Sequence, residues 1–385
     1  MNSVPSIRCI KRPVMRTGIA ERSVLCACLM VSACSNSVDN PRTRLDGGAN
    51  RITADAGEGD TGIPDSGESG DTMGPADAGP LPNPGTPPDP GLPGSSSVSV
   101  STHELELAGG TRPRVTTMTL YLPEAAGPSP VVVFLHGFQL TTDLYASYGQ
   151  HLASHGFVVI MPQMPGGLFG GPNHRELAAY EIAVLDWVEA NAATPDGPLE
   201  GKADVERIGL AGHSMGGKIS MLTASSDARP KAVFGIDPVD AAGGPMAASE
   251  EDYPSVTPEL MPLIDIPLGL LGETTNATCD GFMCQACAPE EDNFQQYYEH
   301  ATRSAIEIKV VGANHMSFLD NPNCGLTCSV CPAGTDDTSA TRLLTRRYMT
   351  AFFEAFLNQQ QGYLPYLSGP GMEADIEAGR VTSRT

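Results

Sequence analysis

The chain has 385 residues, 41% of them hydrophobic, and a formal net charge of −22 at pH 7. A chain of this length can bury a sizeable core. Nucleic-acid binding is excluded as an expected function, because phosphate contacts need clustered Lys and Arg, and no basic stripe follows the first 34 residues.

Residues 1–34 have the pattern of an export signal. Basic residues precede the apolar run VLCACLMVSAC, which is too short to span a bilayer. The run ends in VSAC, which resembles a bacterial lipobox, where the cysteine receives lipid after export. We therefore expect a removed signal peptide, a lipidated Cys34 and an exported protein anchored to a bacterial membrane. An ordinary signal peptide that happens to contain cysteines is the alternative.

Residues 35–96 are rich in Gly, Pro and acidic residues and contain almost no large apolar side chains. Such a segment cannot bury enough apolar area to offset the loss of chain entropy on folding. The sequence therefore predicts a disordered acidic tether that holds a folded part away from the membrane surface.

Strand patterns of two kinds follow the expected tether. Residues 97–107 and 113–122 alternate and are rich in β-branched side chains, which predicts an antiparallel pair at a sheet edge. Short continuous apolar runs then indicate strands buried on both faces of a parallel sheet. These runs are VVVFL, FVVIM, RIGLA, AVFGI, PLGLL and IEIKVV, beginning at residues 131, 157, 207, 232, 267 and 306.

Amphipathic segments separate these runs and predict helices at 142–154, 174–192, 214–225, 291–303 and 340–358. Strands that alternate with helices indicate an α/β fold. It would have a mostly parallel central sheet, helices on both faces and an antiparallel N-terminal edge. One domain over about residues 97–368 accounts for all the patterns and leaves 369–385 as a C-terminal tail.

Cysteines outside the export segment form two clusters. An even number of cysteines in an exported chain favours disulfides. Each cluster ends in Cys-x-x-Cys, so a zinc site is the alternative, but no histidine stands at ligand spacing and no metal is expected. The clusters flank His315, so we expect them to fix the loops around it. The candidates are Cys279, Cys284, Cys287, Cys324, Cys328 and Cys331.

The segment RIGLAGHSMGGKISML places Ser214 in a Gly-x-Ser-x-Gly pattern between a strand and a helix. In this motif the serine occupies a sharp, strained turn, and the flanking glycines lack the Cβ atoms that would collide with neighbouring backbone. Ser214 is therefore the candidate nucleophile. His213, directly before it, is expected to point its ring away and to pack.

A serine nucleophile needs a base, and the base needs an acid that fixes its tautomer. His315 follows a late strand, where this fold carries its base. The order Ser, acid, His leaves two candidates for the acid, Asp237 in GIDPVD and Glu273 in LLGETTN. Residue patterns alone leave this choice open.

An oxyanion site needs two backbone N–H groups. The residue after the nucleophile, Met215, supplies one. The turn in VVVFLHGF, at His136 and Gly137, makes the N–H of Phe138 the candidate for the other.

These motifs resemble the chlorophyllase family of α/β-hydrolases. PVVVFLHGF, LASHGFVVIMPQ, AGHSMGGK, GIDPVD, CAPEEDNFQQYY and NHMSFLDN occur in that family's order. The resemblance implies a triad of Ser214, Asp237 and His315, with Glu273 as the alternative acid. GHSMGG and the His-Gly-Phe turn are also similar to cutinases and polyester hydrolases. The family commonly has Arg where Met215 stands, so the resemblance implies ester hydrolysis more firmly than one substrate.

The expected function is that of a monomeric serine carboxylic-ester hydrolase that forms an acyl-enzyme and needs no cofactor. Its partners would be a small or polymeric ester and, through the lipid anchor, a membrane. A cutinase-like or platelet-activating-factor-acetylhydrolase-like esterase is one alternative, and a non-catalytic surface binding module on the same fold is another. The candidates for an apolar cleft are Phe138, Leu140, Phe169, Met215, Met316 and Phe318, with Phe318 more typical of the core.

Overall fold

The computed structural model describes residues 87–107, 114–166, 171–241, 249–279 and 284–385, all within the compact unit that begins at Ala78. The expected signal peptide, Cys34 and most of the expected tether lie outside the described residues.

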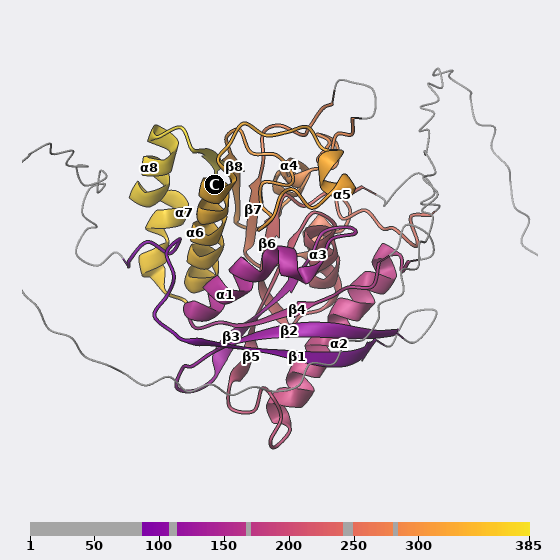
Figure 1. Ribbon diagram of the computed structural model, residues 1–385, viewed down its shortest axis with the longest axis vertical. Helices are drawn as coiled ribbons and strands as arrows, with labels where there is room; N and C mark the ends of the chain where they lie inside the picture. Colours follow the sequence, from indigo (N-terminus) through magenta and orange to yellow (C-terminus); the bar gives the residue numbers. More distant parts are fainter. Residues whose placement is uncertain (1–86, 108–113, 167–170, 242–248, 280–283) are drawn as a thin grey trace, which may run out of the picture. The chain divides into compact units, whose positions relative to one another are not determined.

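A single sheet runs through this unit, with strand order β1-β2-β4-β3-β5-β6-β7-β8-β9 (Figure 1). The strands are β1 (Val98–Leu107), β2 (Arg114–Pro123), β3 (Ser129–Leu135), β4 (Val158–Pro162), β5 (Ala203–His213), β6 (Pro230–Ile236), β7 (Leu268–Gly272), β8 (Ala305–Val310) and β9 (Val381–Arg384).

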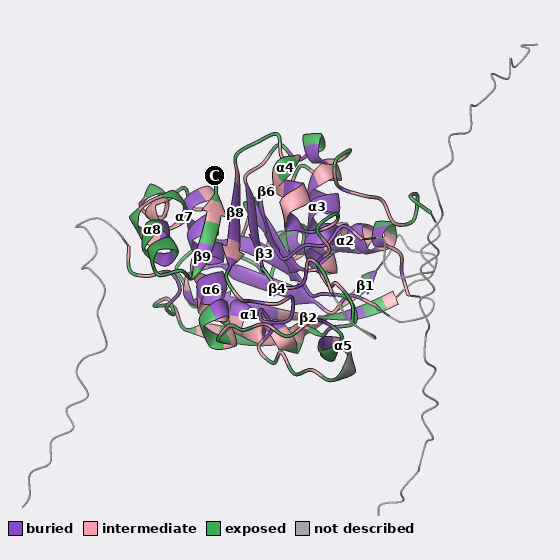
Figure 2. Ribbon diagram, turned by 90° about the horizontal axis from the view of Figure 1, so that it is seen from above, coloured by how far each residue is buried: buried purple, intermediate pink, exposed green. Residues whose placement is uncertain are grey.

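Strands β3 to β8 are parallel, as their continuous apolar sequences predict. At one edge β1 pairs with β2 and β2 with β4, both antiparallel. Figure 2 shows the difference in burial: β3, β4 and β7 are buried throughout, whereas exposed residues alternate along β1. The expected fold, with its antiparallel N-terminal edge, is confirmed.

The helices cover both faces of the sheet. They are α1 (Ala146–Ser154), α2 (His174–Ala193), α3 (Met215–Ser226), α4 (Phe294–Glu299), α5 (Leu326–Ser329), α6 (Thr338–Phe356), α7 (Pro365–Ser368) and α8 (Pro370–Glu377), with short 3-10 turns η1 (Thr142–Tyr145), η2 (Met261–Leu263) and η3 (Gln361–Tyr363). Buried residues of α1 and α6 form one core cluster with the sheet, and those of α2, α3 and α4 form the other.

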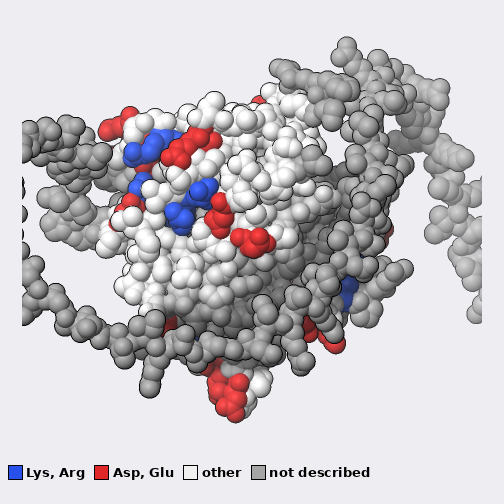
Figure 3. All heavy atoms as spheres, in the orientation of Figure 1, with Lys and Arg blue, Asp and Glu red and all other residues white. Residues whose placement is uncertain are grey.

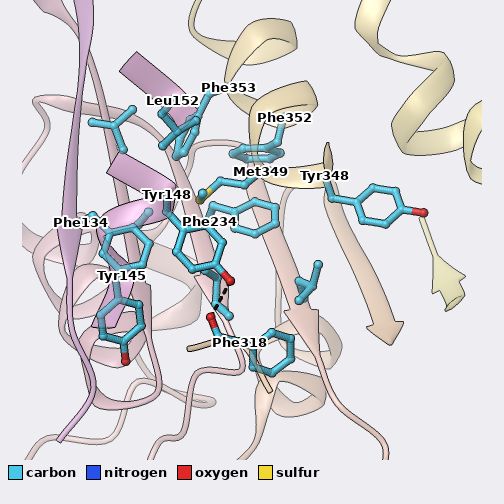
Figure 4. Packing of buried hydrophobic residues seen from close by; sticks show 14 of the residues in the cluster. Phe134, Tyr145, Tyr148, Leu152, Phe234, Phe318, Tyr348, Met349, Phe352 and Phe353 are labelled. Carbon is cyan, nitrogen blue, oxygen red and sulfur yellow. Dashed lines mark hydrogen bonds between the residues drawn. The ribbon is translucent and has the colours of Figure 1, made fainter. Parts of the chain in front are cut away.

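Aromatic side chains dominate the first of these clusters. Figure 4 shows Phe234 of β6 beside Phe352 and Phe353 of α6. Phe134 of β3 stacks on Tyr148 of α1, with ring centroids 5.9 Å apart. This packing fixes η1 and α1 against the strand that ends at the Gly137 turn.

The sheet continues beyond residue 368, the expected end of the domain. Residues 370–377 form α8, and β9 pairs antiparallel with β8 at the far edge of the sheet. Val381 of β9 is buried, and the guanidinium of Arg384 binds the buried carboxylate of Glu307 in β8. A strand as short as VTSR carries little sequence pattern, so its pairing depends on these tertiary contacts.

The folded part also begins before the expected boundary at residue 97. The Arg347 guanidinium on α6 binds the Asp89 carboxylate at 2.5 Å. The His151 ring lies 2.8 Å from the Pro90 carbonyl oxygen, and the Gly94 N–H donates to Ser154 at 2.8 Å. These contacts hold the last residues of the expected tether against α1 and α6.

Candidate active site

The serine of the Gly-x-Ser-x-Gly motif lies between β5 and α3 in a backbone conformation that side chains rarely adopt. Ser214 has φ 56° and ψ −123°. A Cβ on Gly212 would overlap the backbone of Gly216, and one on Gly216 would overlap the carbonyl oxygen of Leu135. The sharp turn expected from the sequence is therefore present, and it leaves the serine side chain partly exposed.

His315 lies between this serine and a carboxylate. Its Nε2 is 2.8 Å from Oγ of Ser214, and its Nδ1 is 2.6 Å from Oδ2 of Asp237. Asp237 follows β6 directly and is fully buried, whereas His315 lies in the loop after β8. Because the carboxyl ends of parallel strands meet at one edge of the sheet, residues about a hundred positions apart come together there.

The second candidate acid, Glu273, lies at the end of the neighbouring strand β7. Its Oε2 accepts hydrogen bonds from the backbone N–H groups of Thr275 and Asn276, the latter at 2.7 Å. Burial, together with the nearby Asp237 carboxylate, raises the pKa of Glu273 to about 8. The structure thus places Asp237, and not Glu273, in hydrogen-bond contact with His315.

Residues 136–140, which we call the oxyanion loop, contain the turn expected to supply an N–H donor. The Gly137 carbonyl oxygen accepts from the Leu140 N–H at 3.1 Å and lies 2.8 Å from Nδ1 of His136. In a trans peptide the C=O and N–H point in opposite directions. Fixing the Gly137 carbonyl therefore also fixes the N–H of Phe138.

The direction of the bond from His136 follows from its other ring nitrogen. Nε2 of His136 lies 2.9 Å from the backbone N–H of Met164, which can only donate. The proton of the neutral ring is therefore on Nδ1, which donates to the Gly137 carbonyl. Burial lowers the pKa of His136 and keeps the ring neutral.

The second expected donor, Met215, is the first residue of α3. The first N–H groups of a helix have no partner within it and attract negative charge. Phe138 and Met215 also line the same pocket.

That pocket has a volume of about 310 Å³. Phe138, Leu140 and Met215, expected in an apolar cleft, all line it. Phe318 and Met316 are instead buried in the core cluster, and Phe169 lies outside the described residues.

Two buried polar groups that sequence patterns did not single out support the site. The Asn276 side chain accepts from the backbone N–H of His315 at 3.0 Å and donates to the Pro332 carbonyl at 3.0 Å. Lys218 of α3 forms a buried ion pair with Asp240 at 3.1 Å. An asparagine after a strand and a lysine in a helix are common in surface segments, so neither gave a signal.

The six expected cysteines form disulfides in the structure: Cys279 with Cys284, Cys287 with Cys331, and Cys324 with Cys328. The second pair joins the loop after β7 to the loop that follows His315. Within the described residues, no cluster of His, Cys, Asp and Glu side chains could hold a metal ion. None of the helices described there has the length and apolar character needed to cross a membrane.

A mostly parallel sheet that presents a strained serine turn after β5, with a histidine loop after its last parallel strand, defines the α/β-hydrolase class. Within that class the chain belongs to the chlorophyllase family, whose model matches residues 94–368. The chain is accordingly a carboxylic ester hydrolase.

Individual relatives agree with this assignment. The chain is 25% identical to Chlorophyllase-2 of Arabidopsis thaliana over 61% of its own length and 76% of the relative's. It is 27% identical to Chlorophyllase-1 of the same plant, over 60% and 73% of the two chains. A shorter similarity, 30% identity over 31% of this chain and 38% of the relative, links it to Cutinase est1 of Thermobifida alba.

Proposed function

We propose that Ser214, His315 and Asp237 form the catalytic triad of this esterase. The observation that carries the proposal is the position of the His315 ring, 2.8 Å from Oγ of Ser214 and 2.6 Å from Oδ2 of Asp237. His315 accepts the serine proton as Oγ attacks the ester carbonyl, and then donates it to the leaving alcohol. Asp237 holds the ring in the required tautomer.

The backbone N–H groups of Met215 and Phe138 hold the negative charge that develops on the carbonyl oxygen. Water then attacks the acyl-enzyme with His315 again as base, which releases the acid and restores the serine. All the groups needed come from this chain, so the reaction as proposed uses no cofactor.

The substrate we propose is an ester with one apolar group that fits the pocket beside the oxyanion donors. Apolar side chains, including Leu140, Met164 and Leu177, line this pocket together with a neutral His136. Its volume of about 310 Å³ suits part of an extended chain or one polymer segment better than a whole large pigment. Relatives named chlorophyllase and cutinase both fit such an ester.

The proposal is tested with Ser214→Ala and a short p-nitrophenyl ester. The variant should lose at least about 10⁴-fold in kcat, because it lacks the Oγ that forms the proposed acyl-enzyme. Retention of the wild-type rate by Ser214→Ala would overturn the triad. A wild-type protein without esterase activity that still bound the ester would instead favour a binding module.

Chlorophyll and polyester film, assayed beside the p-nitrophenyl ester, separate the possible substrates. Hydrolysis of chlorophyll at a comparable kcat/KM would support the substrate named in the plant relatives. Activity on the short ester and film alone would favour a cutinase-like enzyme, and activity on the short ester alone an esterase for small soluble substrates.

We further propose that the mature protein is exported and anchored through lipid on Cys34. The lipobox-like sequence before Cys34 and the three disulfides of the folded part support this. Expression in bacteria supplied with an alkyne fatty acid should label the wild type in the membrane fraction. Cys34→Ser should remain unlabelled, and equal labelling of both proteins would contradict the proposal.

A further inference from the structure

A buried chain of hydrogen bonds joins the oxyanion loop to the loop of His315. The Tyr145 hydroxyl lies 3.2 Å from the backbone N–H of Gly137 and 2.7 Å from Nδ1 of His213. The other ring nitrogen of His213, Nε2, lies 2.9 Å from the backbone carbonyl oxygen of His315. Tyr145 and His213 are both fully buried, so water does not compete for these bonds.

The chemistry of its two ends sets the direction of every bond in this chain. The His315 carbonyl oxygen can only accept a hydrogen bond, so Nε2 of His213 carries the ring proton and donates a hydrogen bond to this oxygen. Nδ1 of the neutral ring is then an acceptor, and the Tyr145 hydroxyl donates a hydrogen bond to it. The Tyr145 oxygen in turn accepts from the Gly137 N–H, which can only donate.

A charged ring would disrupt this arrangement, because both nitrogens of His213 would then donate. Burial, and secondarily the neighbouring His315, hold the pKa of His213 well below its usual range. The ring therefore stays neutral, and every polar group in the chain has the partner it needs.

Neither residue needs to touch an ester to affect its hydrolysis. Gly137 directly precedes Phe138, whose N–H is the proposed oxyanion donor, and His213 directly precedes Ser214. The Tyr145 ring packs against Phe134 in the core, with ring centroids 5.3 Å apart, so its hydroxyl is held by a rigid element.

We propose that Tyr145 and His213 are positioning residues. They hold the oxyanion loop, the turn at Ser214 and the loop of His315 at fixed distances from one another. This inference rests on the triad proposed above and adds to it a structural connection between the base and the oxyanion site. Displacements of about 1 Å at reacting groups can cost on the order of 10²-fold in rate, so such a connection affects catalysis directly.

Tyr145→Phe tests the inference, since it removes one oxygen and keeps the packed ring. It leaves the Gly137 N–H and Nδ1 of His213 without partners in a buried place. We expect kcat for a short p-nitrophenyl ester to fall about 10- to 100-fold, with KM changed less than about threefold. The split between kcat and KM distinguishes misplacement of reacting groups from loss of substrate binding.

Tyr348→Phe is the matched control. It also removes a buried tyrosine hydroxyl, one that lies 2.5 Å from the Asp375 carboxylate on α8. Figure 4 shows its side chain pointing away from Tyr145 and Phe318. The control should lower Tm, because it removes a buried hydrogen bond, while kcat stays within about twofold of the wild type.

A double-mutant cycle then tests whether the two residues act as one unit. His213→Leu breaks the chain at its centre, so adding Tyr145→Phe should reduce kcat by less than about twofold further. If the double variant loses kcat by the product of the two single losses, the inference is overturned. It is also overturned if kcat of Tyr145→Phe is no lower than kcat of the Tyr348→Phe control. If Ser214→Ala is inactive in the same assay, such a result leaves the proposed triad standing.

Discussion

Two buried carboxyl groups lie near His315, and their surroundings separate their roles. Asp237 has φ 43°, an unusual conformation that directs its carboxylate toward the histidine loop, and its Oδ2 binds the His315 ring. Burial and the nearby Asp237 raise the pKa of Glu273 to about 8, which favours the protonated form of Glu273 at neutral pH. Repulsion between two neighbouring carboxylates disfavours ionisation of both, so only one of them is expected to stabilise the imidazolium of His315.

Replacing each acid by its amide should therefore have unequal effects. Asp237→Asn should lower kcat by about 10⁴-fold, because the amide can hold the wrong tautomer of His315. Glu273→Gln should change kcat less than about tenfold at pH 7, since the amide resembles the protonated acid. Steady-state kinetics on a p-nitrophenyl ester compare the two, and the opposite order of losses would identify Glu273 as the triad acid.

At the scale of elements, the base depends on a long loop between β8 and α6 that contains little regular structure. The loop is held by the Cys287–Cys331 disulfide, and by Asn276 and Asn314, whose side chains both donate to the Pro332 carbonyl. The other two disulfides close short segments, Cys279–Cys284 and Cys324–Cys328. The pair with a separation of 44 residues thus joins the two loops that frame His315.

Removing this long-range disulfide should affect stability and activity together. Cys287→Ala with Cys331→Ala should lower the free energy of unfolding by about 2–4 kcal/mol and reduce kcat more than it raises KM. Urea unfolding and steady-state kinetics in oxidising buffer measure both quantities.

The matched control is Cys324→Ala with Cys328→Ala, whose cysteines are 4 residues apart. Its loss of unfolding free energy should be smaller, because closing a short loop removes less entropy from the unfolded chain. Equal losses of kcat in the two double variants would show that the Cys287–Cys331 disulfide does not act through the His315 loop.

At the scale of the whole unit, some buried carboxyl groups are paired with cations and others are held neutral. Arg347 binds Asp89 and Asp375, which joins the first described segment to α8 through α6. On the face shown in Figure 3, the visible Lys and Arg side chains lie close to Asp and Glu, without a broad basic area among the described residues. Glu181, fully buried between α2 and α3, instead accepts from Ser220 at 3.0 Å, and burial raises its pKa to about 8.

Glu181 should make the protein less stable as pH rises. Below about pH 4.5, its ordinary pKa, Glu181 is protonated in both the folded and the unfolded chain. Between there and pH 8 only the unfolded chain releases the proton, which costs about 1.4 kcal/mol of stability for each pH unit. Glu181→Gln removes this dependence, so its Tm relative to the wild type should increase across that range. A difference in Tm that stays constant with pH would contradict a neutral Glu181.

The sequence by itself determined the elements of the fold and much of the candidate site. Apolar runs predicted β3 to β8 because strands covered on both faces need apolar side chains at every position. The glycines around Ser214 predicted its strained turn, and the position of His315 after a late strand identified the candidate base. These signals are local, so they can be read without a structure.

Only the tertiary structure decided which groups meet. Asp237 and Glu273 both follow buried strands, and the register of β6 and β7 together with the Asp237 conformation brings one of them to His315. The edge strand β9, the Asn276 contact and the Tyr145–His213 chain each join residues far apart in sequence. Such contacts leave no periodic pattern, because their energy comes from burial and partner geometry that exist only after the sheet has assembled.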